Sequence, residues 1–185
     1  MSLAACGNAT SAVPPSGPAQ DLNAAAAAMQ TVTSFEFTAK VVTGSQEARI
    51  TGEFAAPNNL HETAQIGTQS LELIRVGSRT YVRSAANTPW APATGSPAPA
   101  DPRAAFRVLE SAGDVTLSGS TYAFTLTGAA AAALIQGAAT VKGTVTLAGG
   151  RIATLSYQAT APAVSVDLAY SNFNGAPAIT LPPGL

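Results

Sequence analysis

The chain has 185 residues, a net charge of −1, and 46% hydrophobic but only 10% charged residues. This length is enough for one domain with a real core, and the charged fraction lies well below the roughly 25% of a typical globular domain. The basic residues are few and scattered, which argues against nucleic-acid binding, and no run of about 18 apolar residues would span a membrane.

The N-terminal segment 1–20 contains Leu3-Ala4-Ala5-Cys6-Gly7, and Cys6 is the only cysteine of the chain. A leucine, two small residues and a cysteine resemble the lipobox of bacterial lipoproteins, in which the cysteine is lipidated. Three prolines among small and hydroxylated residues follow, and this composition is typical of a flexible linker. We expect a lipidated Cys6 on a tether; the alternative is an incidental thiol in a disordered tail.

The folded domain is expected over 21–185, beginning with a helix at about 19–30. Asp21 is the expected N-cap, and Leu22 and Met29 recur at helical spacing on its apolar side. A strand over 34–43 follows, where apolar and polar residues alternate with a period of two, which places the apolar set on one face. That set is Phe35, Phe37, Ala39 and Val41.

The same alternation recurs along the rest of the chain, between turns rich in glycine. Further strands are expected at about 48–54, 60–66, 70–76, 80–84, 115–117, 122–126, 140–147, 152–158 and 164–170. Ala153, Leu155 and Tyr157 are expected to share one face. A loop over 85–100 surrounds Trp90, a helix starts at Asp101-Pro102, and another covers 129–136. The plan is an α+β fold: one strongly curved antiparallel sheet (a half-barrel of about ten strands) with a few short helices over its concave apolar face.

Two stretches carry a resemblance to a known family. One is the strand segment Gly77-Ser78-Arg79-Thr80-Tyr81-Val82-Arg83, with Pro89-Trp90 in the loop after it, and the other is the closing Tyr170-Ser171-Asn172-Phe173-Asn174-Gly175-Ala176-Pro177. Together with the order of elements, they resemble the LppX/LprG-type mycobacterial lipoproteins and, more distantly, the carriers LolA and LolB. The resemblance implies a hydrophobic cavity for lipid acyl chains and an anchor on the outer face of the plasma membrane. It implies no catalytic residue.

A cavity is also expected from the residues alone, because short helices made mostly of alanine would leave a broad apolar sheet under-filled. The expected ligand-cavity residues are Phe35, Phe37, Ile50, Phe54, Leu71, Leu73, Tyr81, Trp90, Phe106, Leu109, Leu117, Phe124, Val145, Leu155 and Val166. The alternative is a sheet that curls and fills its own interior. Trp90 is expected to be a core plug, with a lid anchor as the alternative. Arg75, Arg79 and Arg83 are expected on a solvated face, with contact to an anionic headgroup as the alternative. The open end of the groove should lie toward the Trp90 loop and Phe106.

Catalytic chemistry is not expected. His61 is the only histidine, no familiar metal-ligand spacing occurs, and there is no Gly-x-Ser-x-Gly elbow. The predicted function is therefore a cell-envelope lipoprotein, expected to be a monomer, that binds or carries a lipid or another hydrophobic molecule without a cofactor. The alternatives are a protein-interaction module with a filled core, and an envelope hydrolase, which would need His61 in a cleft beside a serine and an acid.

Overall fold

The computed structural model describes residues 17–84, 88–93 and 102–182, and in this part the chain forms eleven strands and three short helices. They are α1 (Pro18–Gln30), β1 (Ser34–Thr43), β2 (Gln46–Ala55), β3 (Asn59–Ile66), β4 (Gln69–Val76), β5 (Arg79–Arg83), β6 (Ala91–Pro92), α2 (Ala104–Leu109), β7 (Gly113–Ser118), β8 (Thr121–Thr127), α3 (Gly128–Leu134), β9 (Thr140–Ala148), β10 (Arg151–Thr160) and β11 (Ala163–Ser171). The expected α+β fold with one curved antiparallel sheet is confirmed, and the short β6 adds one strand to the ten expected.

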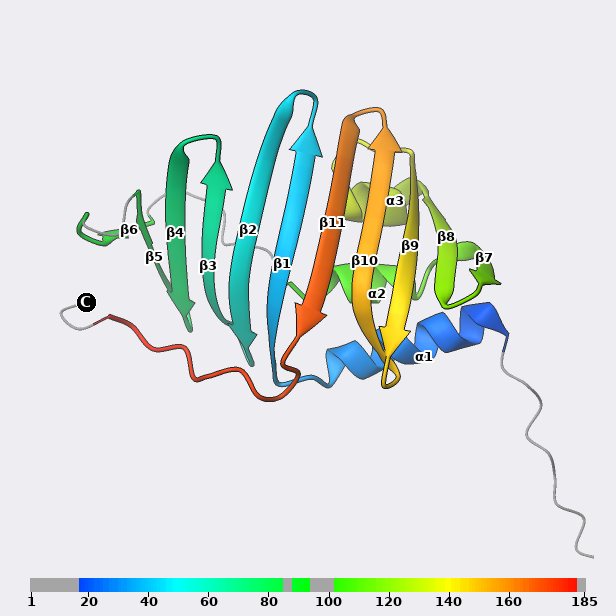
Figure 1. Ribbon diagram of the computed structural model, residues 1–185, viewed down its shortest axis with the longest axis horizontal. Helices are drawn as coiled ribbons and strands as arrows, with labels where there is room; N and C mark the ends of the chain where they lie inside the picture. The colour runs from blue at the N-terminus through cyan, green and yellow to red at the C-terminus, as the bar shows by residue number, and fades with distance from the viewer. Residues whose placement is uncertain (1–16, 85–87, 94–101, 183–185) are drawn as a thin grey trace, which may run out of the picture.

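Two meanders make up the sheet, in the order β6-β5-β4-β3-β2-β1-β11-β10-β9-β8-β7. They join where the first strand pairs with the last, so β1 and β11 lie side by side in the middle of the sheet (Figure 1). This pairing sets Lys40 opposite Asp167 and Phe37 opposite Tyr170. At the junction between the two meanders, charged residues therefore face each other on one side of the sheet and aromatic residues on the other.

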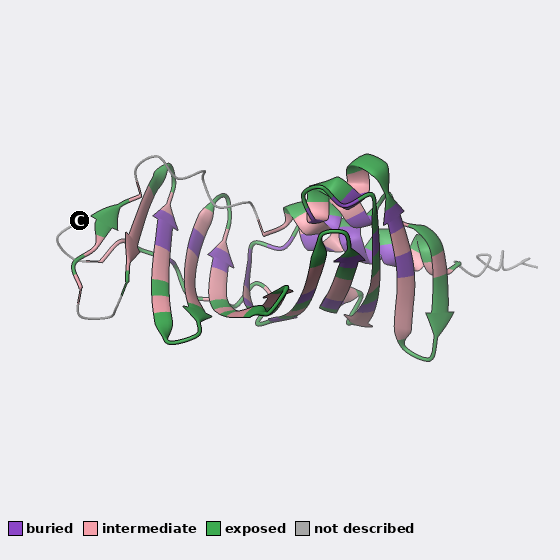
Figure 2. Cartoon of the chain, turned by 90° about the horizontal axis from the view of Figure 1, so that it is seen from above, coloured by how far each residue is buried: buried purple, intermediate pink, exposed green. Residues whose placement is uncertain are grey.

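The three helices lie on one face of the sheet, over the half formed by β7–β11 (Figures 1 and 2). Helix α1 packs against β7 and β10, α3 packs against β8 and β9, and α2 contacts both other helices. We call this face, which carries Phe35, Phe37 and Ala39, the inner face, and the opposite one the outer face. With 13 residues, α1 is about 20 Å long and can cross only about four strands. The inner face of β2–β5 consequently extends beyond the helices.

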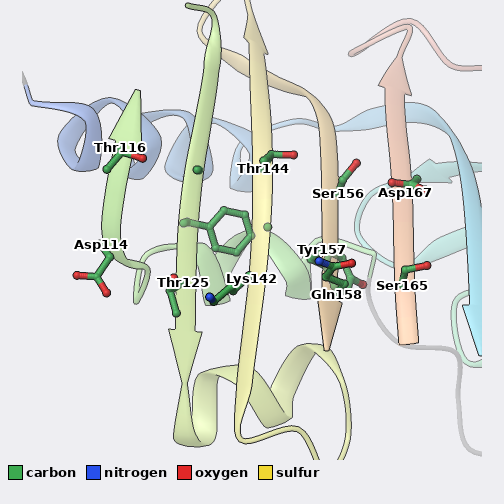
Figure 3. A pocket seen from close by; sticks show the side chains of 13 residues that line it. Asp114, Thr116, Thr125, Lys142, Thr144, Ser156, Tyr157, Gln158, Ser165 and Asp167 are labelled. Carbon is green, nitrogen blue, oxygen red and sulfur yellow. The ribbon is translucent and has the colours of Figure 1, made fainter. Parts of the chain in front are cut away.

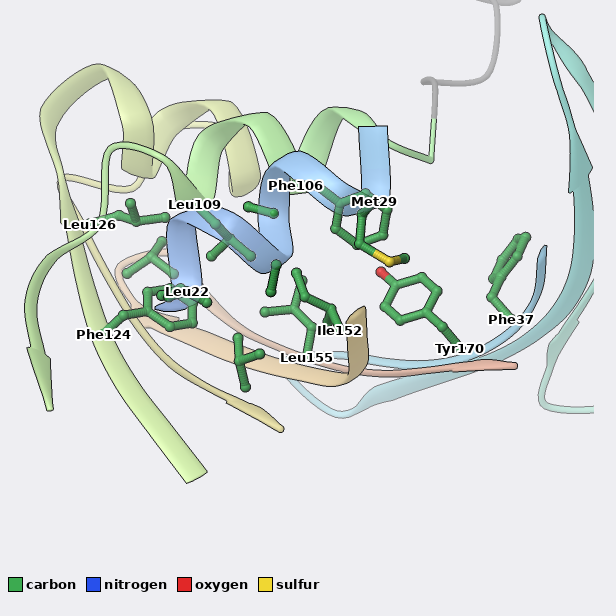
Figure 4. Packing of buried hydrophobic residues seen from close by; sticks show 14 of the residues in the cluster. Leu22, Met29, Phe37, Phe106, Leu109, Phe124, Leu126, Ile152, Leu155 and Tyr170 are labelled. Atoms are coloured by element: carbon green, nitrogen blue, oxygen red, sulfur yellow. The ribbon is translucent and has the colours of Figure 1, made fainter. Parts of the chain in front are cut away.

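The core lies between the helices and the inner face (Figure 4). Phe35 is fully buried, and its ring centroid lies 5.0 Å from that of Phe54, 5.6 Å from Tyr170 and 6.3 Å from Phe106 of α2. In Figure 4, Met29 of α1 lies beside Phe106 and Tyr170. Phe106 itself is fully buried where α1 and α2 meet the sheet, so its side chain belongs to the core.

Helix α1 begins at Pro18, and its N-cap is Gly17 rather than the expected Asp21. The Gly17 carbonyl accepts hydrogen bonds from the backbone N–H groups of Gln20 and Asp21, and the Gln20 side chain accepts one from Gly17 N–H at 3.3 Å. Proline fits the first helical position, where no N–H is needed, so the helix begins one residue before the expected start at about 19. Asp21 thus lies in the first turn, where its charge favours the helix dipole.

The start of helix α2 and the register of strand β10 also differ from what the sequence pattern predicts. Helix α2 begins at Ala104, after an N-cap at Arg103, and the expected cap Asp101 lies outside the described residues. In β10 the register with β9 shifts between Ile152 and Thr154, which makes Ala153 the extra residue of a β-bulge. Ile152 therefore joins the core in place of Ala153, and the expected grouping of Ala153 with the inner-face residues is wrong.

Candidate functional site

A cavity of about 450 Å³ lies on the inner face, between the strands around the β1–β11 junction and helices α2 and α3. Its volume falls within the range of roughly 300–1,000 Å³ that is typical of ligand sites. The walls are almost entirely apolar and consist of Phe37, Ala39, Val41, Ile50, Leu60, Glu62, Pro102, Ala104, Ala105, Ala133, Leu134, Tyr157, Val166, Leu168 and Tyr170.

Small side chains on both sides create this space. Ala39 faces the cavity from β1, while Ala104 and Ala105 line it from α2 and Ala133 from α3. An alanine contributes only its Cβ, so the helices cover the strands here without filling the volume between them. This is the under-filling that the alanine-rich composition of the helices leads one to expect.

Three of the expected cavity residues line this cavity: Phe37, Ile50 and Val166. Most of the others lie in the solid core instead, namely Phe35, Phe54, Phe106, Leu109, Phe124, Val145 and Leu155. Leu73 is half-buried on the inner face, and Leu71 and Leu117 remain 46% and 45% exposed there. The alternation in the sequence identified the inner face of these strands, but not which part of that face the helices fill.

Tyr81 and Trp90 lie apart from the cavity. The two-residue turn at Gly77-Ser78 sets Tyr81 opposite Ile74, and Ile74 is opposite His61, so all three belong to the outer face. Trp90 is half-buried, and the Arg83 guanidinium lies over its ring, 4.6 Å from the centroid. The expectation of a core plug is therefore wrong: Trp90 packs against a charged outer-face side chain.

The three arginines of the β4–β5 hairpin do not share one solvated face. Arg79 is exposed, whereas Arg75 is only 3% exposed, on the inner face opposite Leu60. Its Nε donates a hydrogen bond to the carbonyl of Asn58 at 3.0 Å. The alternation along β4 makes this unavoidable, because Arg75 occupies the same face as Leu71 and Leu73.

His61 lies on the outer face, within a charged group that includes Glu72 and Arg83. The distance from His61 Nε2 to Glu72 Oε1 is 2.8 Å, and Arg83 Nε donates to Glu72 Oε2 at 2.5 Å. The hydrogen bond from Arg83, together with that from His61, holds the pKa of Glu72 below its usual range. In the part of the chain that the structure describes, His61 is thus paired with Glu72, which also binds Arg83, rather than with the serine and acid of a hydrolase.

Glu62 is a charged residue of the cavity that was not among the expected cavity residues. It lies on β3 between Leu60 and Ala64, opposite Gly52 of β2, and so points to the apolar inner face. Burial raises the pKa of its carboxyl group, and the nearby positive charge of Arg75 partly opposes that shift. The sequence does contain a sign of this residue: Glu62 occupies a position of β3 where the alternation calls for an apolar side chain.

Replacing Glu62 by glutamine should stabilise the protein at neutral pH and not under acidic conditions. Because the folded-state pKa is raised, the contribution of Glu62 is fully present below the unfolded value near 4.5 and is lost as pH rises through the folded value. We expect Glu62→Gln to melt roughly 1–3 °C above the parent at pH 7. Calorimetry at several pH values, with Glu53→Gln on the outer face of β2 as the control, checks this; an equal gain at low pH would contradict it.

A second cavity, of about 540 Å³, lies on the outer face over β7–β11 (Figure 3). Its walls carry the charged groups of Asp114, Lys142 and Asp167, together with several hydroxyl groups. The backbone of Gly143 lies in the middle of this surface, but its side-chain position is on the inner face, beside the ring of Phe124. Such walls suit water and polar solutes, so the inner cavity is the better candidate for an apolar ligand.

Comparison with known proteins gives a match in fold. No family model and no curated protein matches the sequence. The lipoprotein LppX from Mycobacterium tuberculosis is similar in structure over 88% of this chain and 98% of its own, with a TM-score of 0.65 and 11% identity. LprF from Mycobacterium bovis is similar over 90% of this chain and 97% of its own, with a TM-score of 0.63 and 13% identity. The chain therefore has the LppX/LprG-type lipoprotein fold, as its motifs and element order indicated. None of the helices in the described residues is long and apolar enough to cross a membrane.

Proposed function

We propose that this chain is a cell-envelope lipoprotein whose domain, residues 21–185, binds or carries a lipid or another apolar molecule in the inner cavity. The observation that carries the proposal is the cavity itself: about 450 Å³, apolar walls, and a position between the sheet and two alanine-rich helices. The fold shared with the lipoprotein LppX supports the same class of protein. We assign no catalytic role, no cofactor and no nucleic-acid partner.

The anchor belongs to the same proposal. Lipidation of Cys6 would hold the protein on the outer face of the bacterial plasma membrane, and the proline-rich segment between Cys6 and helix α1 would act as a spacer. Cys6 and most of this segment lie outside the described residues. The lipobox-like sequence is what supports the proposed anchor and spacer. A single domain on a single tether is consistent with a monomer.

Three ionisable groups on the cavity walls lie in surroundings that disfavour charge. Burial raises the pKa values of the Tyr157 and Tyr170 hydroxyl groups as well as that of the Glu62 carboxyl. All three changes have desolvation as their largest cause, which means that the walls disfavour charge. An apolar cavity that water does not solvate well gains free energy when an apolar chain enters it.

Filling the cavity should abolish binding of apolar molecules. Ala39 lies on the floor of the cavity, opposite Ile50 and Leu168, so Ala39→Phe would place a ring in that space. We expect the fluorescence of Nile red, a neutral apolar dye, to rise with the parent protein and to stay near the buffer value with Ala39→Phe.

The matched control is Ala169→Phe, which makes the same change on the neighbouring strand. Ala169 is exposed and pairs with Thr38 on the outer face, so this variant should bind Nile red like the parent. Native mass spectrometry of protein from its own host, with the anchor removed, should also show bound lipid. Equal dye binding by Ala39→Phe and Ala169→Phe would contradict the proposed binding site.

A protein-interaction module is the second candidate, because the inner face of β3 and β4 keeps two large apolar side chains accessible. Ile66 and Leu71 are 48% and 46% exposed. If this surface were the functional one, the parent protein would carry no lipid and would bind Nile red no better than Ala39→Phe. The cavity experiment therefore separates the two functions.

A further inference from the structure

Glu62 is the one charged side chain among the described residues that line the inner cavity. Its cross-strand neighbours are Gly52 on β2 and Leu73 on β4. The ring of Phe37 leans across Gly52, since a Cβ on that glycine would lie 2.6 Å from the ring edge. The Glu62 side chain is therefore half-buried and framed by apolar groups. No hydrogen bond to it is found within the described part of the chain, and burial raises its pKa.

A carboxylate in such a place favours a ligand that can donate a hydrogen bond to it. Burying a polar group without a partner is costly, and a bound donor would relieve that cost at the wall of the cavity. An apolar ligand with no donor would leave the carboxylate as it is. The polar end of the ligand is thus expected to lie beside Glu62, with its chain along the apolar walls.

The charges around Glu62 decide which kind of donor fits. Arg75 lies on the adjacent strand, close enough to oppose the pKa shift of Glu62, but it does not itself line the cavity. An anionic headgroup would meet the Glu62 carboxylate first and be repelled. A cationic headgroup would be attracted by Glu62 but opposed by the buried charge of Arg75. A neutral hydroxyl group avoids both penalties and still donates.

We propose that Glu62 makes the cavity selective for amphiphiles whose polar end is a neutral hydroxyl group, such as long-chain alcohols or hydroxylated lipids, over those that end in a carboxylate. This inference rests on the proposed function, since it names the ligand class of the same cavity. Sites built to hydrogen-bond a hydroxyl group reject analogues that lack it, so the preference should be measurable with ligands of equal chain length.

Displacement of Nile red from the full chain at neutral pH tests this selectivity. Dodecanol, its methyl ether and dodecanoate share one chain and differ at the end: a donor, no donor, and a negative charge. We expect dodecanol to displace the dye at a concentration about tenfold lower than either of the other two, a factor equivalent to one hydrogen bond. With Glu62→Leu the three ligands should converge.

Two variants make the role of the carboxylate specific. Glu62→Gln keeps an acceptor but removes the charge, so dodecanol should still displace better than its methyl ether, while the disadvantage of dodecanoate shrinks. Glu53→Gln, on the outer face of β2, should keep the selectivity of the parent. Thermal melting of each variant confirms that it is folded, and Glu62→Gln carries the test if Glu62→Leu does not fold.

The outcomes separate this inference from the proposed function. Failure of the parent protein to bind Nile red, or retention of the dye by Ala39→Phe, overturns the proposed function and this inference with it. Normal dye binding with equal displacement by all three ligands overturns the selectivity alone. A preference for dodecanol that persists unchanged in both Glu62 variants assigns it to another group and likewise overturns the role of Glu62.

Discussion

Replacing Phe35 by alanine should lower the free energy of unfolding by about 3–5 kcal/mol. Phe35 is fully buried, and its ring contacts residues from three other elements: Phe54 of β2, Phe106 of α2 and Tyr170 of β11. The loss combines the burial of a large apolar side chain with a cavity at the point where both meanders and a helix meet. Few neighbours can collapse into that space, because each belongs to a different element.

Urea denaturation of the variant and the parent protein measures this loss. Phe173→Ala is the matched control, since Phe173 is only half-buried, after the last strand, with the Arg151 guanidinium 5.7 Å from its ring centroid. We expect that variant to lose about 1 kcal/mol or less. If the two variants lost the same free energy of unfolding, the contacts of Phe35 with three other elements would not be central to the stability of the core.

Gly143→Ala should also destabilise the protein, by about 1–3 kcal/mol or more, through overpacking. A Cβ on Gly143 would lie 2.5 Å from the carbonyl oxygen of Ser156 on β10 and would also meet the ring of Phe124 on β8. The first contact is with the backbone of the neighbouring strand, which cannot rotate away. The glycine is thus required by space and not by backbone conformation, because its φ is not positive.

Gly113→Ala is the control for this change. Gly113 also lies in a strand without a positive φ, but a Cβ there would meet only Thr125 O, at an ordinary 3.8 Å. This variant should be neutral or slightly more stable than the parent, because alanine reduces the freedom of the unfolded chain. Adding Phe124→Leu to Gly143→Ala should recover only part of the loss, since the Ser156 contact remains. Equal urea midpoints for the two glycine variants would refute the steric explanation.

The same arrangement occurs in both meanders, and it shows what a sequence can and cannot reveal. In the first, the ring of Phe37 covers Gly52 on the paired strand; in the second, the ring of Phe124 covers Gly143. A glycine inside an alternating strand signals a close approach of some kind. Its partner depends on the register between two strands, which the spacing along one strand does not contain.

For the candidate site, the sequence identified the inner face more reliably than the cavity. Phe37, Ile50 and Val166 were expected at a cavity wall and line one, because alternation fixes the face to which a side chain points. Tyr81 was expected there too, yet it lies on the outer face, since the short turn before β5 sets it opposite Ile74. Glu62 was passed over because an acid on an apolar face looks like an interruption of the pattern.

What the sequence determined by itself is the local order: alternating strands, short alanine-rich helices, glycine turns, and hence one antiparallel sheet with a single well-covered face. These features follow from periodicity and turn chemistry, which act over a few residues. Only the tertiary structure decided the pairing of β1 with β11, the burial of Phe106, and the restriction of the helices to one half of the sheet. The physical reason is that these features depend on contacts between residues far apart in the chain, and on how much volume their side chains leave between them.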